Sequence, residues 1–145
     1  MSTVNKVLEK KGRDVLSVSP DTAVFDAIEK MAGRSAGTAL VMDGDQLVGI
    51  ISERDFIRKI YLKKKCEEDI KVGDIMSADL TTVSPDESLE NCMNLMTDKR
   101  IRHLPVVEEG KVTGIISIGD LVKYMVSEKD FLIENLQSYI AAPGM

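Results

Sequence analysis

Apolar positions along the chain follow a fixed order of short extended and helical patterns. A brief extended stretch at residues 15–18 precedes a pattern of helical spacing, in which Val24, Ala27, Ile28 and Met31 share one face. This spacing predicts an amphipathic helix whose apolar stripe packs on a sheet.

Two strand patterns follow this helix. Residues 38–42 and 46–52 are rich in apolar side chains, and the Asp-Gly-Asp between them is typical of a hairpin turn. A second helix is predicted to begin near Ser52, because apolar residues return at helical spacing after it. The resulting unit has the order β-α-β-β-α.

The same unit recurs 65 residues later in the chain. Val-Ser-Pro-Asp at residues 18–21 returns at 83–86, and Gly-Ile-Ile-Ser-x-x-Asp at 49–55 returns at 114–120. Eleven of 43 aligned positions are identical without a gap, whereas average composition gives about three. The sequence therefore predicts an internal duplication, with the second hairpin at 104–117.

The Ser-Pro-Asp of each unit predicts where its first helix begins. Serine is a favoured N-cap and proline is favoured at the first helical position, so we expect caps at Ser19 and Ser84. In the second unit, Glu87 would complete a capping box with Ser84.

A unit of about 50 residues is marginally stable alone, so the two repeats are expected to share a core. We predict a first domain at 1–62 that includes a short helical lead, a linker at 63–71, a second domain at 72–127 and a helical extension at 128–145. The first lead is followed by three more residues before its strand than the second lead is. The extension either continues the preceding helix or packs back as a separate one.

Composition narrows the function classes. The 145 residues carry a net charge of −5, with no apolar run of the length that spans a membrane and no apolar core of a secretory signal near the start. Cys66 and Cys92 do not have the spacing of a metal or redox site, and Cys92 occupies a core position of its helix. His103 is the single histidine, without an evident nucleophile beside it. We predict a cytoplasmic protein that is not an enzyme and has no metal site.

The recurring Ser-x-x-Asp has two interpretations. In one, serine and aspartate form a capping box at a helix start. In the other, the helix N-terminus and the serine hydroxyl favour a phosphate, while the carboxylate accepts both hydrogens of a ribose diol. The spacing alone leaves both interpretations open.

The duplicated unit, the Val-Ser-Pro-Asp opening, the Arg-His-Leu-Pro-Val-Val strand at 102–107 and the Ser-x-x-Asp ending together resemble a pair of cystathionine-β-synthase (CBS) domains. The resemblance extends over about residues 4–127, and the chain is most similar to stand-alone proteins made of little more than one CBS pair. It implies an α/β fold in which tandem β-α-β-β-α repeats form one pseudo-two-fold pair, a Bateman module.

The resemblance also implies a function. CBS pairs are regulatory modules that bind adenosine-containing ligands, namely AMP, ADP, ATP, S-adenosylmethionine or NAD, in clefts between the repeats. The implied ligand is an adenine nucleotide that acts as a regulator, with no cofactor required. The regulated protein is not identified by the sequence.

The family pattern implies two clefts. The first would be lined by Ser52, Asp55, Arg58, Lys59, Arg102, His103 and Pro105. The second would be lined by Ser17, Val18, Gly37, Thr38, Ile115, Ser117 and Asp120. In each, the aspartate would hold ribose hydroxyls, the serine would face ribose or phosphate, and hairpin backbone would meet adenine. The second cleft lacks the Arg-His of the first, so it offers fewer cationic contacts to a phosphate.

Two other functions compete with ligand sensing. The clefts could be vestigial in a module that regulates a partner protein, or the basic stretch at 54–65 could bind nucleic acid, although no aromatic platform accompanies it. We also expect a homodimer, because the second helices and the extension carry surplus apolar residues. These are Phe56, Ile57, Ile60, Tyr61, Leu121, Val122, Met125, Val126, Phe131, Leu132, Leu136 and Ile140.

Overall fold

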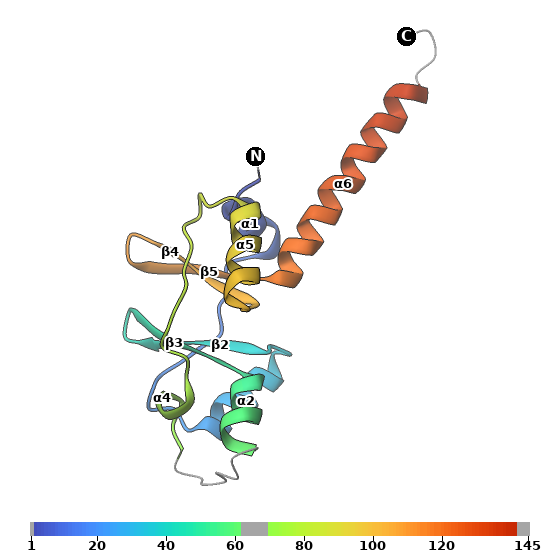
Figure 1. Ribbon diagram of the computed structural model, residues 1–145. Helices are drawn as coiled ribbons and strands as arrows, with labels where there is room; N and C mark the ends of the chain where they lie inside the picture. The colour runs from blue at the N-terminus through green and yellow to red at the C-terminus, as the bar shows by residue number, and fades with distance from the viewer. Residues whose placement is uncertain (1, 62–69, 142–145) are drawn as a thin grey trace.

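The computed structural model describes residues 2–61 and 70–141, and it has the predicted α/β architecture with two repeats (Figure 1). The first repeat contains β1 (Ser17–Val18), α2 (Val24–Gly33), β2 (Thr38–Asp43), β3 (Gln46–Ser52), α3 (Glu53–Phe56) and the π-helical segment η1 (Ile57–Tyr61). The second contains α5 (Leu89–Lys99), β4 (His103–Glu108), β5 (Lys111–Ser117) and α6 (Ile118–Ala141). Two lead helices, α1 (Val4–Lys11) and α4 (Val72–Ile75), precede the repeats.

The two hairpins have equivalent registers. Strand β2 pairs antiparallel with β3 and parallel with β1, while β4 pairs antiparallel with β5. In place of a full first strand, the second repeat has a single parallel bridge from Val83 to Val106. Thr38 and His103, which start the two hairpins, contact each other with 3.3 Å between Thr38 Oγ1 and His103 Nδ1. The hairpins therefore face one another, as Figure 1 shows.

The first helix of each repeat begins later than the sequence pattern predicts. Ser19 O accepts from Thr22 N–H and Ser84 O accepts from Glu87 N–H, both at 3.1 Å, so each Ser-Pro-Asp forms a turn. Helix α2 begins at Val24, and α5 begins after Ser88, whose hydroxyl accepts from Asn91 N–H. The predicted caps at Ser19 and Ser84, and the capping box with Glu87, were therefore wrong.

The cause of this shift is the neighbouring lead segment. Val24 N–H donates to Ile70 O, and Ala23 forms an antiparallel bridge with Lys71, which holds the residue before α2 extended. An extended residue is the normal N-cap conformation, so the helix starts at the next residue.

Each lead helix packs on the repeat that it does not precede. Val4, Val7 and Leu8 of α1 are buried in the core of the second repeat, and Val72 and Ile75 of α4 are buried in the core of the first. The boundaries 1–62 and 72–127 thus follow chain order, while the packing crosses between them. This exchange ties the two repeats into one folding unit.

The extension continues the preceding helix. Helix α6 runs unbroken for 24 residues and projects away from the rest of the molecule (Figure 1). Its first turns bury Leu121 and Tyr124 against the second repeat, whereas Val122, Met125 and Val126 are exposed. Among the helices of the described part of the chain, none is long and apolar enough to cross a membrane.

The cysteine at the core position of α5 is a buried structural thiol. Cys92 is fully buried in the second core, and burial, with a smaller contribution from Glu87, raises the pKa of its thiol to about 11. A thiol with so high a pKa is not a nucleophile at neutral pH. Cys66 lies outside the described residues.

Candidate functional site

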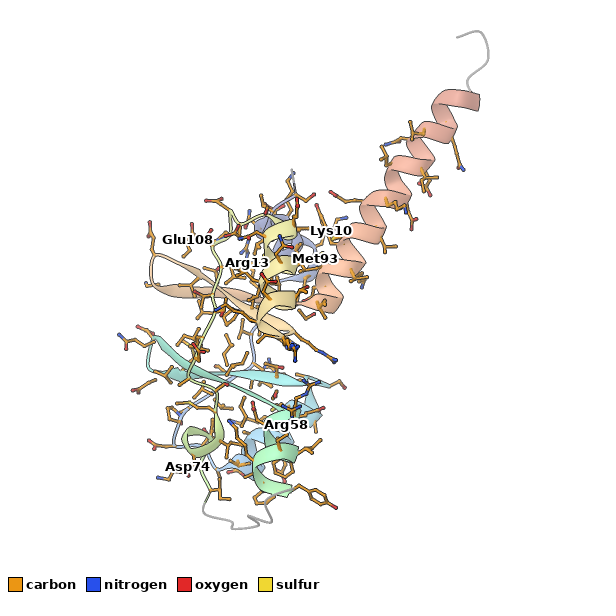
Figure 2. The ribbon with its side chains drawn as sticks, viewed as in Figure 1. Lys10, Arg13, Arg58, Asp74, Met93 and Glu108 are labelled. Carbon is orange, nitrogen blue, oxygen red and sulfur yellow. The ribbon has the colours of Figure 1, made fainter. Side chains whose placement is uncertain are left out.

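A cavity of about 700 Å³ opens between the two repeats. It receives side chains from the end of β3, from α3 and η1, and from the start of β4. Figure 2 shows the side chains of this region, with Arg58 labelled on the first repeat. The lining residues are Gly37, Thr38, Ile50, Ser52, Glu53, Arg54, Asp55, Ile57, Arg58, Ser77, Asp79, Leu80, Thr81, Arg100, Ile101, Arg102, His103 and Pro105.

Ser52 and Asp55 form a capping box at one wall of this cavity. Ser52 N–H donates to Asp55 Oδ2 at 2.9 Å, and Asp55 N–H donates to Ser52 Oγ at 3.2 Å. Glu53 N–H donates to Gly37 O at 3.1 Å. Protein atoms therefore already accept from these N–H groups at the helix start, which favours the capping interpretation over a phosphate held by backbone N–H groups.

The Asp55 carboxylate can still accept hydrogen bonds from a ligand. Its side chain keeps 20% of its surface exposed, and its Oδ1 atom is 3.8 Å from Lys59 Nζ. The Lys59 ammonium instead donates to Ile75 O at 2.8 Å and joins η1 to α4. Lys59 therefore does not line the cavity, although the sequence pattern assigned it to the first cleft.

Four arginines line the cavity. Arg54 and Arg58 come from the first repeat, whereas Arg100 and Arg102 come from the second. A guanidinium group can bind two phosphate oxygens at once, so this arrangement suits an anionic group. Three carboxylates, from Glu53, Asp55 and Asp79, share the lining and limit the net charge of the cavity.

His103 lies between the two repeats. Burial lowers the pKa of its imidazole, and the charges of Lys11 and Arg102 lower it further, against the opposite effect of Asp120. The ring is therefore neutral at pH 7, with one nitrogen able to accept a hydrogen bond. Its contact with Thr38 fixes the ring at the cavity wall.

The second predicted cleft has a different structure. Ser117 N–H donates to Asp120 Oδ2 at 2.8 Å, so the Ser-x-x-Asp is again a helix cap. Lys11 Nζ, however, lies 2.6 Å from the same Asp120 oxygen and 2.6 Å from Ile115 O. Burial alone would raise the pKa of the Asp120 carboxyl, but hydrogen bonds from Lys11 and Ser117 outweigh burial and lower that pKa.

The remaining residues assigned to the second cleft are divided between two places. Gly37 and Thr38 line the cavity with Ser52 and Asp55. Ser17 and Val18 pair with β2 inside the first repeat, where Val18 is part of the core. Asp120 does not line the cavity that Gly37 and Thr38 share with Asp55.

Sequence reasoning missed several lining residues. Leu80 and Thr81 were detectable, because the repeat offset maps the extended stretch at 15–18 onto 80–83. Arg100 ends α5 in the left-handed conformation, with φ of 54°, and Ser77 reaches the wall through its backbone bridge to Ile50. No pattern in the sequence marked these last two residues.

Comparison with protein-family models matches this chain in two segments. The family model described as CBS domain matches residues 11–62 and 72–127. The chain belongs to the CBS-domain family. A crystal structure of a CBS domain protein, NE2398, has 46% sequence identity, covers 86% of this chain and 98% of its own, and superposes with a TM-score of 0.82.

Three further proteins are similar to this chain. The mitochondrial CBS domain-containing protein CBSX3 of Arabidopsis thaliana is 38% identical over 96% of this chain, which spans 72% of that protein. The chain spans only 58% of a 34% identical, uncharacterized Methanopyrus kandleri protein. The CBS pair of MJ0100, solved with 5′-methylthioadenosine and S-adenosylmethionine, has 20% identity over 88% of this chain and 98% of its own, with a TM-score of 0.77, and shows the shared fold.

Proposed function

We propose that this CBS pair is a non-catalytic regulatory module that binds one adenosine-containing ligand in the cavity between its repeats. The observation that carries the proposal is that Asp55 of the first repeat lines the same cavity as Arg102 and His103 of the other repeat. A ligand held by both walls would link the repeats, which is the arrangement that a sensor needs.

The size and chemistry of the cavity support a nucleotide. Small-molecule sites commonly measure roughly 300–1,000 Å³, and this cavity measures about 700 Å³. Asp55 can accept the two hydrogens of a ribose diol, the arginines can hold phosphates, and Ile50, Ile57 and Pro105 offer apolar surface to a base. AMP, ADP and ATP fit this set best, and NAD and S-adenosylmethionine share the adenosine part. The adenosine ligands of the MJ0100 pair support the same class.

We also propose a homodimer. Ile57, Tyr61, Val122 and Val126 are each about half exposed or more on the second helices, whereas Ile60 and Leu121 are buried within the chain. Leu132 and Leu136 add exposed apolar surface on α6, and the side chains of Phe131 and Ile140 lie outside the described residues. Light scattering should give about 32 kDa, twice the 16.0 kDa of one chain. A mass of one chain at all concentrations would exclude the dimer.

The cytoplasmic location and a regulated partner protein stay predictions. The Arabidopsis relative is named as a mitochondrial protein. Of the basic stretch invoked for nucleic acid, Arg54 and Arg58 line the cavity. Lys63, Lys64 and Lys65 lie outside the described residues. The ligand proposal thus uses two of the cations on which the nucleic-acid alternative depends.

Titration calorimetry with AMP, ATP, S-adenosylmethionine and NAD tests the proposal. In Asp55→Asn, at least one charge-assisted hydrogen bond worth about 1.5–3 kcal/mol weakens, so the affinity for the ligand that binds should fall at least about tenfold. The matched control is Asp45→Asn, at an exposed turn between β2 and β3. No binding of any of the four ligands, or equal affinity in both variants, would overturn the proposal.

A further inference from the structure

The two capping boxes differ in what occupies the space beside them. In the first repeat, Ile50 and Asp55 both line the open cavity. Their equivalents 65 residues later are Ile115 and Asp120, and the Lys11 ammonium donates to an oxygen of each at 2.6 Å. In the first repeat these two residues line an open cavity, whereas in the second repeat the Lys11 side chain of the same protein contacts their equivalents.

The lead helices explain how Lys11 reaches this position. Leu8 and Met76 are equivalent, because each packs against the glycine of a Gly-Ile-Ile-Ser motif, Gly114 and Gly49 respectively. Helix α4 ends just before Met76, at Ile75, whereas α1 continues for three residues beyond Leu8. The additional turn ends at Lys11, and a lysine at a helix C-terminus is favoured by the helix dipole.

Several other contacts fix α1 in place. Lys10 lies over the Tyr124 ring, with 5.0 Å from its Nζ atom to the ring centroid, where α1 meets α6 (Figure 2). Tyr124 and Ser2 each donate to Glu128, at 2.9 and 2.8 Å. With the apolar side of α1 buried as well, the Lys11 ammonium is delivered by a rigid element.

We propose that Lys11 is an internal plug that closes the second adenosine cleft by occupying the Asp120 carboxylate. The protein then binds one ligand per chain, in the cleft of Asp55. The ammonium binds Oδ2 of Asp120, the oxygen that also accepts from Ser117 N–H, and it bridges this carboxylate to Ile115 O. This inference rests on the proposed function and deepens it, because it assigns the number of sites and the residue that sets this number.

Equilibrium dialysis with AMP gives the number of sites directly. Wild-type protein should bind one AMP per chain, and Lys11→Ala should bind two. Lys10→Ala, which removes the neighbouring cation outside the cleft, should still bind one. Asp55→Asn combined with Lys11→Ala should recover at least tenfold affinity over Asp55→Asn alone, because the opened second cleft takes over.

A measurement without ligand keeps the plug testable if Lys11→Ala loosens the fold. In wild-type protein, carbon-detected NMR should give the Asp120 carboxyl a pKa below 3.8. In Lys11→Met, which retains most of the side chain but not its charge, this pKa should rise. An unchanged pKa would show that no ion pair forms in solution and would overturn the plug.

The outcomes separate the two proposals. One AMP in both wild type and Lys11→Ala overturns the plug and leaves the first cleft intact. Two AMP in wild type and one in Lys11→Ala would show that Lys11 is a ligand contact, which also overturns the plug. No AMP bound by wild type, Lys11→Ala or the double variant would overturn the proposed AMP site together with the plug.

Discussion

The two Ser-x-x-Asp sites of this chain share a motif and a cap geometry, yet their surroundings differ. Asp55 has a lysine 3.8 Å away that is bound elsewhere, and it lines a cavity of about 700 Å³. Asp120 has a lysine at 2.6 Å that is directed at its carboxylate. The comparison teaches that a repeated motif specifies the local cap, while the neighbouring helix determines which other groups contact the carboxylate.

The largest difference between the repeats should appear in stability. Leu8 is fully buried in the second core, whereas its equivalent Met76 is only partly buried in the first. Replacing a buried leucine by alanine costs about 2–5 kcal/mol, so Leu8→Ala should lower the free energy of unfolding more than Met76→Ala does. Urea denaturation measures both. An equal or smaller loss in Leu8→Ala would mean that α1 does not belong to the second core.

A smaller effect concerns Arg102 of the second repeat. The equivalent position in the first repeat is Gly37. Arg102→Ala should weaken AMP binding about tenfold, because a guanidinium–phosphate contact is lost, while adenosine affinity should change little. Calorimetry with both ligands measures the split. The control is Arg34→Ala, an exposed arginine at the end of α2 that does not line the cavity. Equal losses for AMP and adenosine would assign Arg102 to the strand rather than to phosphate.

The smallest effect is a pH dependence at the boundary between the repeats. The pKa of His103 in the folded protein is below 6.5, chiefly because of burial, with Lys11 and Arg102 lowering it and Asp120 opposing them. Between that lowered pKa and 6.5 the unfolded chain binds more protons, so the free energy of unfolding should fall as pH falls through this window. His103→Gln should remove this component. Because His103 is the single histidine, NMR titration measures its pKa cleanly, and a value above 6.5 would contradict the account.

The sequence was most informative where local pattern and tertiary packing agree. The predicted strand at 46–52 coincides with β3, and the repeat correctly placed β5 as its equivalent. The prediction of helix starts at Ser19 and Ser84 failed because a Ser-Pro-Asp turn and an extended cap have similar residue preferences. The deciding factor was pairing with the lead segments. For α5 this segment is distant in sequence, because Ser88 forms its bridge with Thr3.

The candidate site was predictable in part for the same reason. The resemblance to CBS pairs implied a cleft that joins Ser52 and Asp55 to Arg102 and His103, and these four residues line the cavity. The role of Lys11 could not be predicted from the motif. The three additional residues of the first lead were visible, but only the packing of α1 on the opposite repeat gives them a consequence.

The central claim is one open adenosine cleft and one closed by the chain itself. A crystal structure of the wild-type protein with AMP tests it most directly. The account predicts one nucleotide per chain, with its ribose hydroxyls on Asp55, its phosphate toward Arg102, and Lys11 still bound to Asp120 and Ile115. A nucleotide whose ribose contacts Asp120, with the Lys11 ammonium displaced, would contradict it.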